Sequence, residues 1–323
     1  MTAAGDLERW TAWSCTVELT VDCREPARRA DLTRDAGVEV RELMSRVAAA
    51  VNRFDPDSEI SRLNSACGAP TILSPLAFQL LQVALDAASA TRGAVDPTVG
   101  GDLIRAGYDY DIAVVRHRRE PGDRTISRPH GGHPGRTDWR SVRLDGDRRI
   151  VTLPPGVTVD LGATAKAWTA DAAARRAHAR TGRPVLVSIG GDLSTAGARP
   201  APWGIEVAER EGDDPTRIGL THGGLATSSV LARSWTDAAG TARHHIIDPS
   251  TGTSVDGRWR SASVWAPTAL GANIASTWVL VDAASAVVDL LTAGRPARLV
   301  GTDGRVTRLG AWPDDPEVIE AAA

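Results

Sequence analysis

Cysteine is scarce in this chain: only three occur among 323 residues, at Cys15, Cys23 and Cys67. An odd number of cysteines without a CxxC pair argues against a disulfide framework and against a zinc site. Reduced thiols are typical of proteins in the cytoplasm, so we expect a cytoplasmic protein.

Long apolar runs and an excess of one charge are also missing. No stretch of about 18 apolar residues occurs, and the N-terminal MTAAGDLERW carries charges where a secretory signal needs an apolar core, so we expect no membrane partner. A formal net charge of −3 provides no basic surface for nucleic acid. What is present is a hydrophobic content of 42%, which is ordinary for a globular protein that folds alone.

The first hundred residues predict one strand and two helices. Alternating apolar and polar residues over 13–21 indicate a half-buried strand. Apolar residues at helical spacing predict an amphipathic helix over 40–54. A second helix over 76–91 has clear ends, because Ser74 is a good N-cap and Gly93 stops it.

The segment 116–137 lacks periodicity and is rich in Arg, Pro, Gly and His, so we expect an exposed loop there. The spacing of His130 and His133 suggests a metal site, but such a site needs further ligands that are held rigidly. A surface loop without a metal is the favoured interpretation.

Short strands and helices alternate through the rest of the chain. The connections mix hairpins with crossovers, which favours an α+β fold over a doubly wound parallel sheet. We expect strands at 142–144, 150–153, 185–189, 203–207, 298–301 and 306–309, and helices over 165–180 and after Pro267.

Seven short segments combine glycines or prolines with side chains that can carry chemistry. They are FDPDSEISRLN (54–64), GAVDPTVGG (93–101), VDLGATAKAW (159–168), VSIGGDL (187–193), GLATSS (224–229), HHIIDPSTG (244–252) and SVWAPTALGANIAST (263–277). In this order the set resembles the ApbE family of FAD:protein FMN transferases. The resemblance implies an ApbE-like (T-fold-like) α+β fold of mixed sheet layers with packed helices, in a single domain over 1–323.

The DLGATAK segment joins a strand to a helix. Gly162 allows close backbone approach, and Thr164 is able to cap the helix. A helix N-terminus of this kind attracts phosphate, although an ordinary capped turn has the same sequence pattern. The resemblance implies that Asp160 and Lys166 contact FAD and that the backbone carbonyl of Ala163 binds Mg²⁺.

Asn273 and Thr277 are four residues apart on a predicted helix, so both side chains project from one face. The resemblance implies that these positions bind Mg²⁺, with an Asp where this chain has Asn273. An amide keeps an oxygen ligand but lacks the full negative charge, which weakens magnesium binding. The alternative is that Thr277 bonds to its own helix and Asn273 is an interior polar residue.

The resemblance implies that His245, which precedes the IIDP segment, is the general base. The pKa of a free imidazole lies near 6.5, so a neutral ring can take a proton from an attacking hydroxyl. Asp248 either orients this imidazole or organises the turn from Pro249 to Gly252. The alternative role for His245 is a contact to the flavin or support of the turn. His244 is expected to face outward from a strand pair.

The remaining FAD contacts follow from the resemblance. Ala94, Val95 and Asp96 match a segment that touches FAD, although Asp96 before Pro97 is also a good turn former. Phe54 stands where an aromatic residue, commonly Tyr, packs near the flavin, and Ile247 is implied as a further contact.

Three polar residues keep two interpretations each. Asp192 after Gly190 and Gly191 is either a polar wall of the site or a plain turn residue. Thr227 and Ser228 either hydrogen-bond phosphate or flavin, or are ordinary polar residues of a strand end.

The activity implied by the resemblance is Mg²⁺-dependent transfer of FMN from FAD to a Ser or Thr hydroxyl of an acceptor flavoprotein, with release of AMP. The acceptor motif is of the DGxSGAT kind, and this chain has none, so we do not expect self-modification. Two alternatives stay open: an FAD pyrophosphatase that makes FMN and AMP, and a flavin-binding protein in which Asn273 has abolished transfer.

Overall fold

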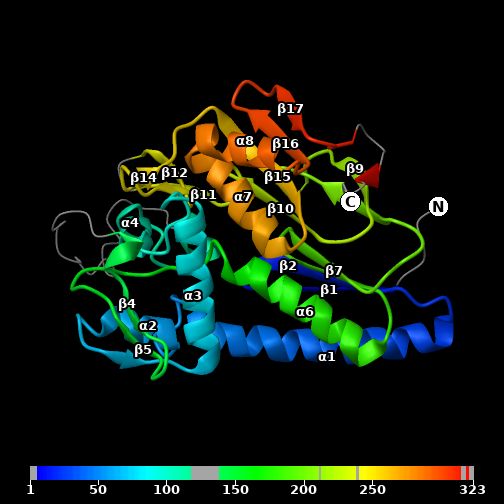
Figure 1. The fold of residues 1–323 in the computed structure, drawn as a ribbon, viewed down its shortest axis with the longest axis horizontal. Coiled ribbons are helices and arrows are strands. Elements are labelled where there is room, and N and C mark those ends of the chain that lie inside the picture. Colours follow the sequence, from blue (N-terminus) through cyan, green and yellow to red (C-terminus); the bar gives the residue numbers. More distant parts are fainter. Residues whose placement is uncertain (1–5, 118–137, 211, 238–239, 314–317, 320–323) are drawn as a thin grey trace. The chain divides into compact units, whose positions relative to one another are not determined.

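The structure is a computed structural model that describes residues 6–117, 138–210, 212–237, 240–313 and 318–319 (Figure 1). The chain forms two compact units, neither of them continuous in sequence. The first unit takes its described residues from Met1–Ser45, Lys166–Ala232 and Gly257–Ala323, and the second from Arg46–Ala165 and Arg233–Asp256. Among the described helices, none is both long and apolar enough to cross a membrane.

An eight-stranded sheet forms the centre of the first unit. Its strand order is β1-β2-β6-β7-β10-β15-β16-β17, and every neighbouring pair is antiparallel. The strands are β1 (Asp6–Ala12), β2 (Cys15–Val21), β6 (Val185–Ile189), β7 (Asp192–Ala196), β10 (Gly224–Ser229), β15 (Trp259–Ala266), β16 (Ala297–Gly301) and β17 (Val306–Leu309).

The strand predicted from residue 13 begins at Cys15, because Trp13 and Ser14 form a turn. Their φ angles of 52° and 53° are the positive values that a two-residue hairpin of type I′ requires. The turn joins β2 to β1, a strand that the sequence did not predict. The alternation of apolar and polar residues continues through the turn, so the sequence pattern could not mark the start of β2.

Helices accompany the sheet of the first unit. They are α1 (Pro26–Val51) and α6 (Ala165–Thr181), each with one end in the second unit, together with α7 (Ala269–Val281) and α8 (Ala283–Thr292). Figure 1 shows α6 beside the first part of α1, where Arg180 lies 3.1 Å from Asp35. The helix predicted over 40–54 is the second half of α1, which begins earlier, at Pro26, and ends at Val51, before Phe54.

Small residues let α7 pack closely on β10 and β15. Ala226, Ala266 and Ala272 are fully buried there. A Cβ on Gly224 would lie 2.1 Å from the backbone nitrogen of Ala269, so only glycine fits at this point of the strand. A smaller sheet, β18-β9-β8, covers a second apolar cluster of the first unit and consists of β8 (Trp203–Val207), β9 (Thr216–Leu220) and β18 (Val318–Ile319).

The second unit has short elements joined by long connections. Its helices are α2 (Glu59–Ser65), α3 (Pro75–Ala90), α4 (Gly100–Arg105), α5 (Ile112–His117) and a 3₁₀ turn at Trp139–Ser141. Three of its strands form a sheet in the order β3-β5-β4, namely β3 (Thr71–Ile72), β4 (Arg143–Asp145) and β5 (Ile150–Thr152). Four more form two hairpins: β11 (Ser234–Thr236) with β12 (Ala242–His244), and β13 (Ile247–Asp248) with β14 (Thr253–Ser254).

The capping prediction for α3 is confirmed, because Ser74 Oγ accepts a hydrogen bond from the backbone nitrogen of Ala77 at 3.2 Å. The loop predicted over 116–137 is wrong in its first two positions, since Arg116 and His117 are the last residues of α5. The rest of that segment, including His130 and His133, lies outside the described residues.

Candidate functional site

A chain of buried polar side chains connects α6, β7 and α7 in the first unit. The turn of Gly190 and Gly191, with φ angles of 63° and 90°, places Asp192 at the first position of β7. One carboxylate oxygen of Asp192 accepts a hydrogen bond from Asn273 Nδ2 at 2.7 Å. The other lies 3.4 Å from Lys166 Nζ. Asp192 and Asn273 are only 2% and 6% exposed, so these groups depend on one another for their polar contacts.

The chain continues through three hydroxyls. Ser276 Oγ donates to the backbone carbonyl of Asn273 at 3.0 Å. Because that uses its only proton, Ser228 donates to Ser276 across 2.8 Å, and Thr277 in turn donates to Ser228 across 2.9 Å. With this order of donors, the oxygen of Thr277 accepts no bond from Ser228. The prediction that Asn273 and Thr277 share one helix face is confirmed, and the hydroxyl of Thr277 pairs with Ser228.

Thr227 points to a different neighbour from Ser228. Its hydroxyl lies 2.8 Å from Ser263 Oγ, directly across the β10–β15 pair. Adjacent strand residues face opposite sides of a sheet, so only Ser228 of the two joins the network below α7.

The oxygen atoms of this network suit a hard cation. Asn273 Oδ1 and Asp192 Oδ2 are buried, and neither accepts a hydrogen bond from any residue that the structure describes. Amide, hydroxyl and carboxylate oxygens are the ligands that Mg²⁺ prefers. Across the same described ranges, no three His, Cys, Asp or Glu side chains gather as a metal site. The fit to Mg²⁺ therefore depends on Asn273 and Thr277.

In the second unit, the segments around Asp96 and Asp160 lie side by side. The backbone nitrogen of Asp160 donates to the carbonyl of Pro97 at 2.8 Å, and Val99 forms a β-bridge with Thr158. Gly162 donates to Asp160 Oδ1 at 2.7 Å. This turn leaves Ala163 exposed just before α6.

Thr164 lies directly before α6, in the turn that leads into the helix. Its hydroxyl donates to the carbonyl of Leu161 at 3.3 Å and so stabilises that turn.

Arg53 is a site residue that the sequence analysis missed. Its guanidinium bonds the carboxylate of Asp160 and donates to the carbonyl of Tyr108 at 2.7 Å. It also lies 4.2 Å above the ring of Phe54. The side chains of Arg53 and Asp160 are 6% and 15% exposed, so this ion pair is largely shielded from solvent. Asp160 therefore holds the loop through Arg53 and Gly162.

An aromatic cluster brings two predicted flavin contacts together. Phe54 and Ile247 both pack in the cluster that contains Tyr108 and Trp235. The rings of Phe54 and Tyr108 meet edge to face with centroids 5.4 Å apart, and Tyr108 stacks on Trp235 at 5.2 Å. Burial raises the pKa of Tyr108. Trp235 donates its indole nitrogen to the carbonyl of Ala106 at 2.8 Å, which fixes its ring.

Asp96 is buried at the centre of a turn. Its Oδ1 accepts from the backbone nitrogen and the hydroxyl of Thr98 at 2.8 and 2.6 Å, and its Oδ2 accepts from the nitrogen of Trp139 at 3.2 Å. Burial raises the pKa of this carboxyl group, and the Thr98 bonds act in the opposite direction. Val95 beside it is buried and Ala94 is half-buried. The turn-forming role of Asp96 is thus confirmed.

The two adjacent histidines have different surroundings. His245 follows β12, is half-buried, and donates its backbone nitrogen to the carbonyl of Arg233 at 3.2 Å. His244 is also half-buried rather than facing outward, and its Nε2 donates to the carbonyl of Val255 at 3.0 Å. Burial lowers the pKa of His244. Asp248 organises the following turn, since its Oδ1 accepts from the nitrogen of Ser250 at 2.6 Å.

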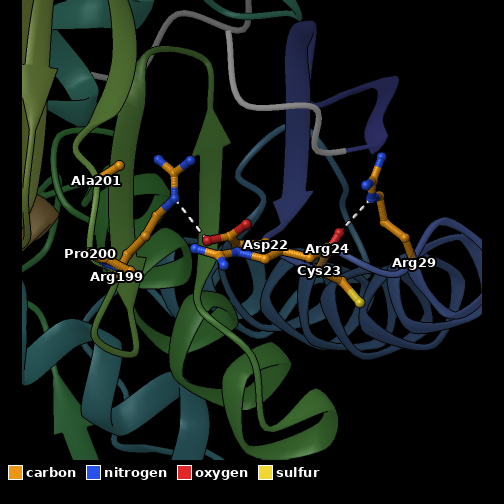
Figure 2. A pocket seen from close by; sticks show the side chains of 7 residues that line it. All are labelled: Asp22, Cys23, Arg24, Arg29, Arg199, Pro200 and Ala201. Atoms are coloured by element: carbon orange, nitrogen blue, oxygen red, sulfur yellow. Dashed lines mark hydrogen bonds and ion pairs between the residues drawn. The ribbon is translucent and has the colours of Figure 1, made fainter. Parts of the chain in front are cut away.

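A cavity of about 340 Å³ lies elsewhere in the first unit, beside the end of β2 (Figure 2). Two of its arginines are already engaged: Arg199 pairs with Asp22 at 2.9 Å, and Arg29 donates to the carbonyl of Cys23 at 2.7 Å. No residue that the sequence predicted for the site lines this cavity.

Proteins of known name resemble this chain over most of its length. An FAD:protein FMN transferase of Haemophilus influenzae is 28% identical over 257 residues, which cover 75% of this chain and 71% of that protein. An FAD:protein FMN transferase of Salmonella typhimurium is 27% identical over 237 residues, or 72% of this chain and 66% of that protein.

Solved structures have the same fold. The ApbE protein of Thermotoga maritima superposes with a TM-score of 0.79 at 26% identity, covering 95% of this chain and 97% of its own. The flavin transferase ApbE of Vibrio cholerae superposes with a TM-score of 0.73 at 19% identity, covering 96% of this chain and 98% of its own. The predicted α+β, ApbE-like fold is therefore confirmed. Since the model of the ApbE family also matches residues 11–299, across both units, this chain belongs to the ApbE family.

Proposed function

We propose that this chain is an FAD:protein FMN transferase that moves FMN from FAD to a Ser or Thr hydroxyl of an acceptor flavoprotein and releases AMP. The observation that carries the proposal is the buried Asn273 Oδ1 on α7, which accepts no bond from the described residues, with the hydroxyl of Thr277 one turn further along the same helix. Membership of a family whose relatives bear this name supports it.

In the proposed reaction, the acceptor oxygen attacks the phosphorus of the FMN half of FAD. The new P–O bond forms as the bond to the AMP phosphate breaks, and AMP leaves. His245 accepts the proton of the attacking hydroxyl, which is a suitable task for a neutral imidazole near pH 7. Most of the acceleration comes from positioning and charge neutralisation, so no covalent protein nucleophile is needed.

The binding roles are divided between the two units. Asn273 and Thr277 of the first unit would hold Mg²⁺, which supplies positive charge beside the diphosphate when bound. Phe54 and Ile247, already packed in one aromatic cluster, are proposed to contact the flavin.

The other proposed FAD contacts already bond to neighbouring protein groups. Lys166 is proposed to bind the diphosphate as a cation. Asp96 and Asp160 shape the two adjoining turns, and we propose that Ala94, Val95 and these turns contact FAD mainly through backbone atoms. We propose further that the chain works as one transferase domain over residues 1–323 in the cytoplasm, with an acceptor motif of the DGxSGAT kind.

The test is to incubate the purified chain with FAD, Mg²⁺ and an acceptor domain that carries a DGxSGAT motif. We expect flavin fluorescence on the acceptor that survives SDS, and none on an acceptor with the hydroxyl residue changed to Ala. AMP without labelled acceptor would establish the pyrophosphatase instead. Copurified flavin with neither product would establish a binding protein.

A further inference from the structure

The chemistry of Asp192 fixes the orientation of the Asn273 side chain. An ionised carboxylate only accepts hydrogen bonds, so the amide must turn its NH₂ group toward it. The 2.7 Å contact is therefore an Nδ2–H donation, and the amide oxygen is directed away from Asp192. In that orientation Asn273 Oδ1 is buried and accepts no bond from the described part of the chain. Leaving a buried carbonyl oxygen without a partner is costly unless a ligand fills it.

We propose that Asp192 is the positioning residue of the metal ligand Asn273: it holds the amide with Oδ1 ready for the cation and adds a carboxylate to the outer shell. This inference rests on the proposed function, whose Mg²⁺ it concerns. Outer-shell carboxylates orient metal ligands and raise their basicity. Lys166 lies 3.4 Å from the second oxygen of Asp192. Its positive charge offsets the buried negative charge of Asp192 when no cation is bound.

The arrangement explains how an amide can stand at the position of the expected carboxylate. The negative charge then lies on Asp192, the hydrogen-bond partner of the ligand, and not on the ligand Asn273 itself. The two side chains occupy separate elements, β7 and α7, so each can be changed without altering the backbone of the other.

The first variant is Asp192→Asn, which keeps size and shape. The new amide no longer forces the orientation of Asn273 and carries no charge. With Mn²⁺ as an EPR-visible hard cation and FAD present, we expect the full-length variant to bind Mn²⁺ about 10- to 100-fold more weakly than the natural chain. Asp22→Asn is the matched control, because it removes a carboxylate of the same unit that pairs with Arg199.

The second variant exchanges the two groups, Asp192→Asn with Asn273→Asp. The amide at 192 then donates to a carboxylate at 273, and that carboxylate becomes the direct ligand. We expect Mn²⁺ affinity to return to within about tenfold of the natural chain. A role of Asp192 confined to stability predicts no such rescue, and thermal unfolding without metal reports stability separately.

Each outcome decides between the two proposals. Natural Mn²⁺ affinity in Asp192→Asn, or a folded exchange variant without recovery, overturns the positioning role and leaves FMN transfer by the natural chain intact. Absence of Mn²⁺ binding by the natural chain, with and without FAD, overturns the metal part of the proposed function and this inference with it. Weak binding in Asp192→Asn and recovery in the exchange variant support the inference.

Discussion

The two units hold their candidate site residues in different ways. In the first unit, Lys166, Asp192, Asn273 and Thr277 lie on helices and strands and join one buried polar network. In the second, the candidates lie in turns and at element ends, beside an aromatic cluster and the Arg53–Asp160 ion pair. Regular elements fix oxygen atoms as a cation requires, whereas rings and turns suit a large planar ligand. This contrast agrees with the roles proposed above, in which the side-chain ligands of the cation belong to the first unit and the flavin contacts and the base to the second.

The largest effect is expected at His245. Changing His245→Ala removes the proposed base, so transfer should fall by about two to four orders of magnitude. Affinity for FAD should change little, since the aromatic cluster and the polar network remain. Transfer rates and flavin fluorescence titrations measure the two quantities separately. A parallel loss of FAD affinity would show that the imidazole is a binding contact, and the division of roles between the units would be wrong.

The next effect concerns the stability of the second unit. Arg53→Met leaves the carboxylate of Asp160 without its partner at a site where the two side chains are only 6% and 15% exposed. Breaking a buried ion pair from one side costs about 3 to 5 kcal/mol in unfolding free energy. Arg140→Met, which breaks the exposed pair with Asp138, should cost less than about 1 kcal/mol. Equal urea midpoints for the two variants would contradict the structural role of Arg53.

A smaller loss is expected for the first unit at Asp171. This buried carboxylate on α6 accepts from the backbone nitrogens of Ala269 and Leu270 at 2.8 and 3.0 Å, and so holds the start of α7. Asp171→Ala should lower the unfolding free energy by about 2 to 3 kcal/mol. Asp35→Ala, at the exposed pair with Arg180, should change it by less than about 0.5 kcal/mol. Similar unfolding curves for the two variants would show that α7 does not depend on this carboxylate.

Acid should affect the second unit before the first. Burial lowers the pKa of His244 below its ordinary value of 6.5, so stability is fully present above pH 6.5 and is lost as the pH falls from there through the lower pKa of the folded state. In the first unit, the Arg260 bond lowers the pKa of Glu209, so loss there begins only below 4.5.

Hydrogen exchange at descending pH, corrected for intrinsic rates, follows the two units separately. Opening of the second unit should rise first, and His244→Gln should reduce that early rise because the amide keeps a donor for Val255 but does not titrate. Simultaneous opening of both units near pH 4.5 would contradict the assignment to His244.

Much of the fold could be predicted because local signals agree with the tertiary structure. The strands at Val185–Ile189, Trp203–Val207 and Val306–Leu309 match the predicted bounds, and Ser74 caps α3 as expected. The start of α1 was missed because the polar residues after Pro26 hide the helical period in that stretch. The turn at Trp13 and Ser14 contains no glycine, so no sequence signal marked it.

The candidate site was predictable in its motifs but not in their partners. Asn273 and Thr277 share a helix face as the i, i+4 spacing requires. The partner of Asn273 is Asp192, 81 positions away, and the partner of Asp160 is Arg53, 107 positions away. Pairings of this kind arise from tertiary structure alone, so the physical role of each carboxylate could not be read from its own motif.

The most direct test of the account is the stoichiometry of the reaction. The natural chain, FAD and Mg²⁺ are incubated with a DGxSGAT peptide, and modified peptide and AMP are measured together by mass spectrometry and chromatography. For the proposed transferase we expect a peptide heavier by FMN less one water, with one AMP formed for each modified peptide. AMP formed in the absence of peptide modification, or no AMP at all with FAD bound, would contradict the transferase.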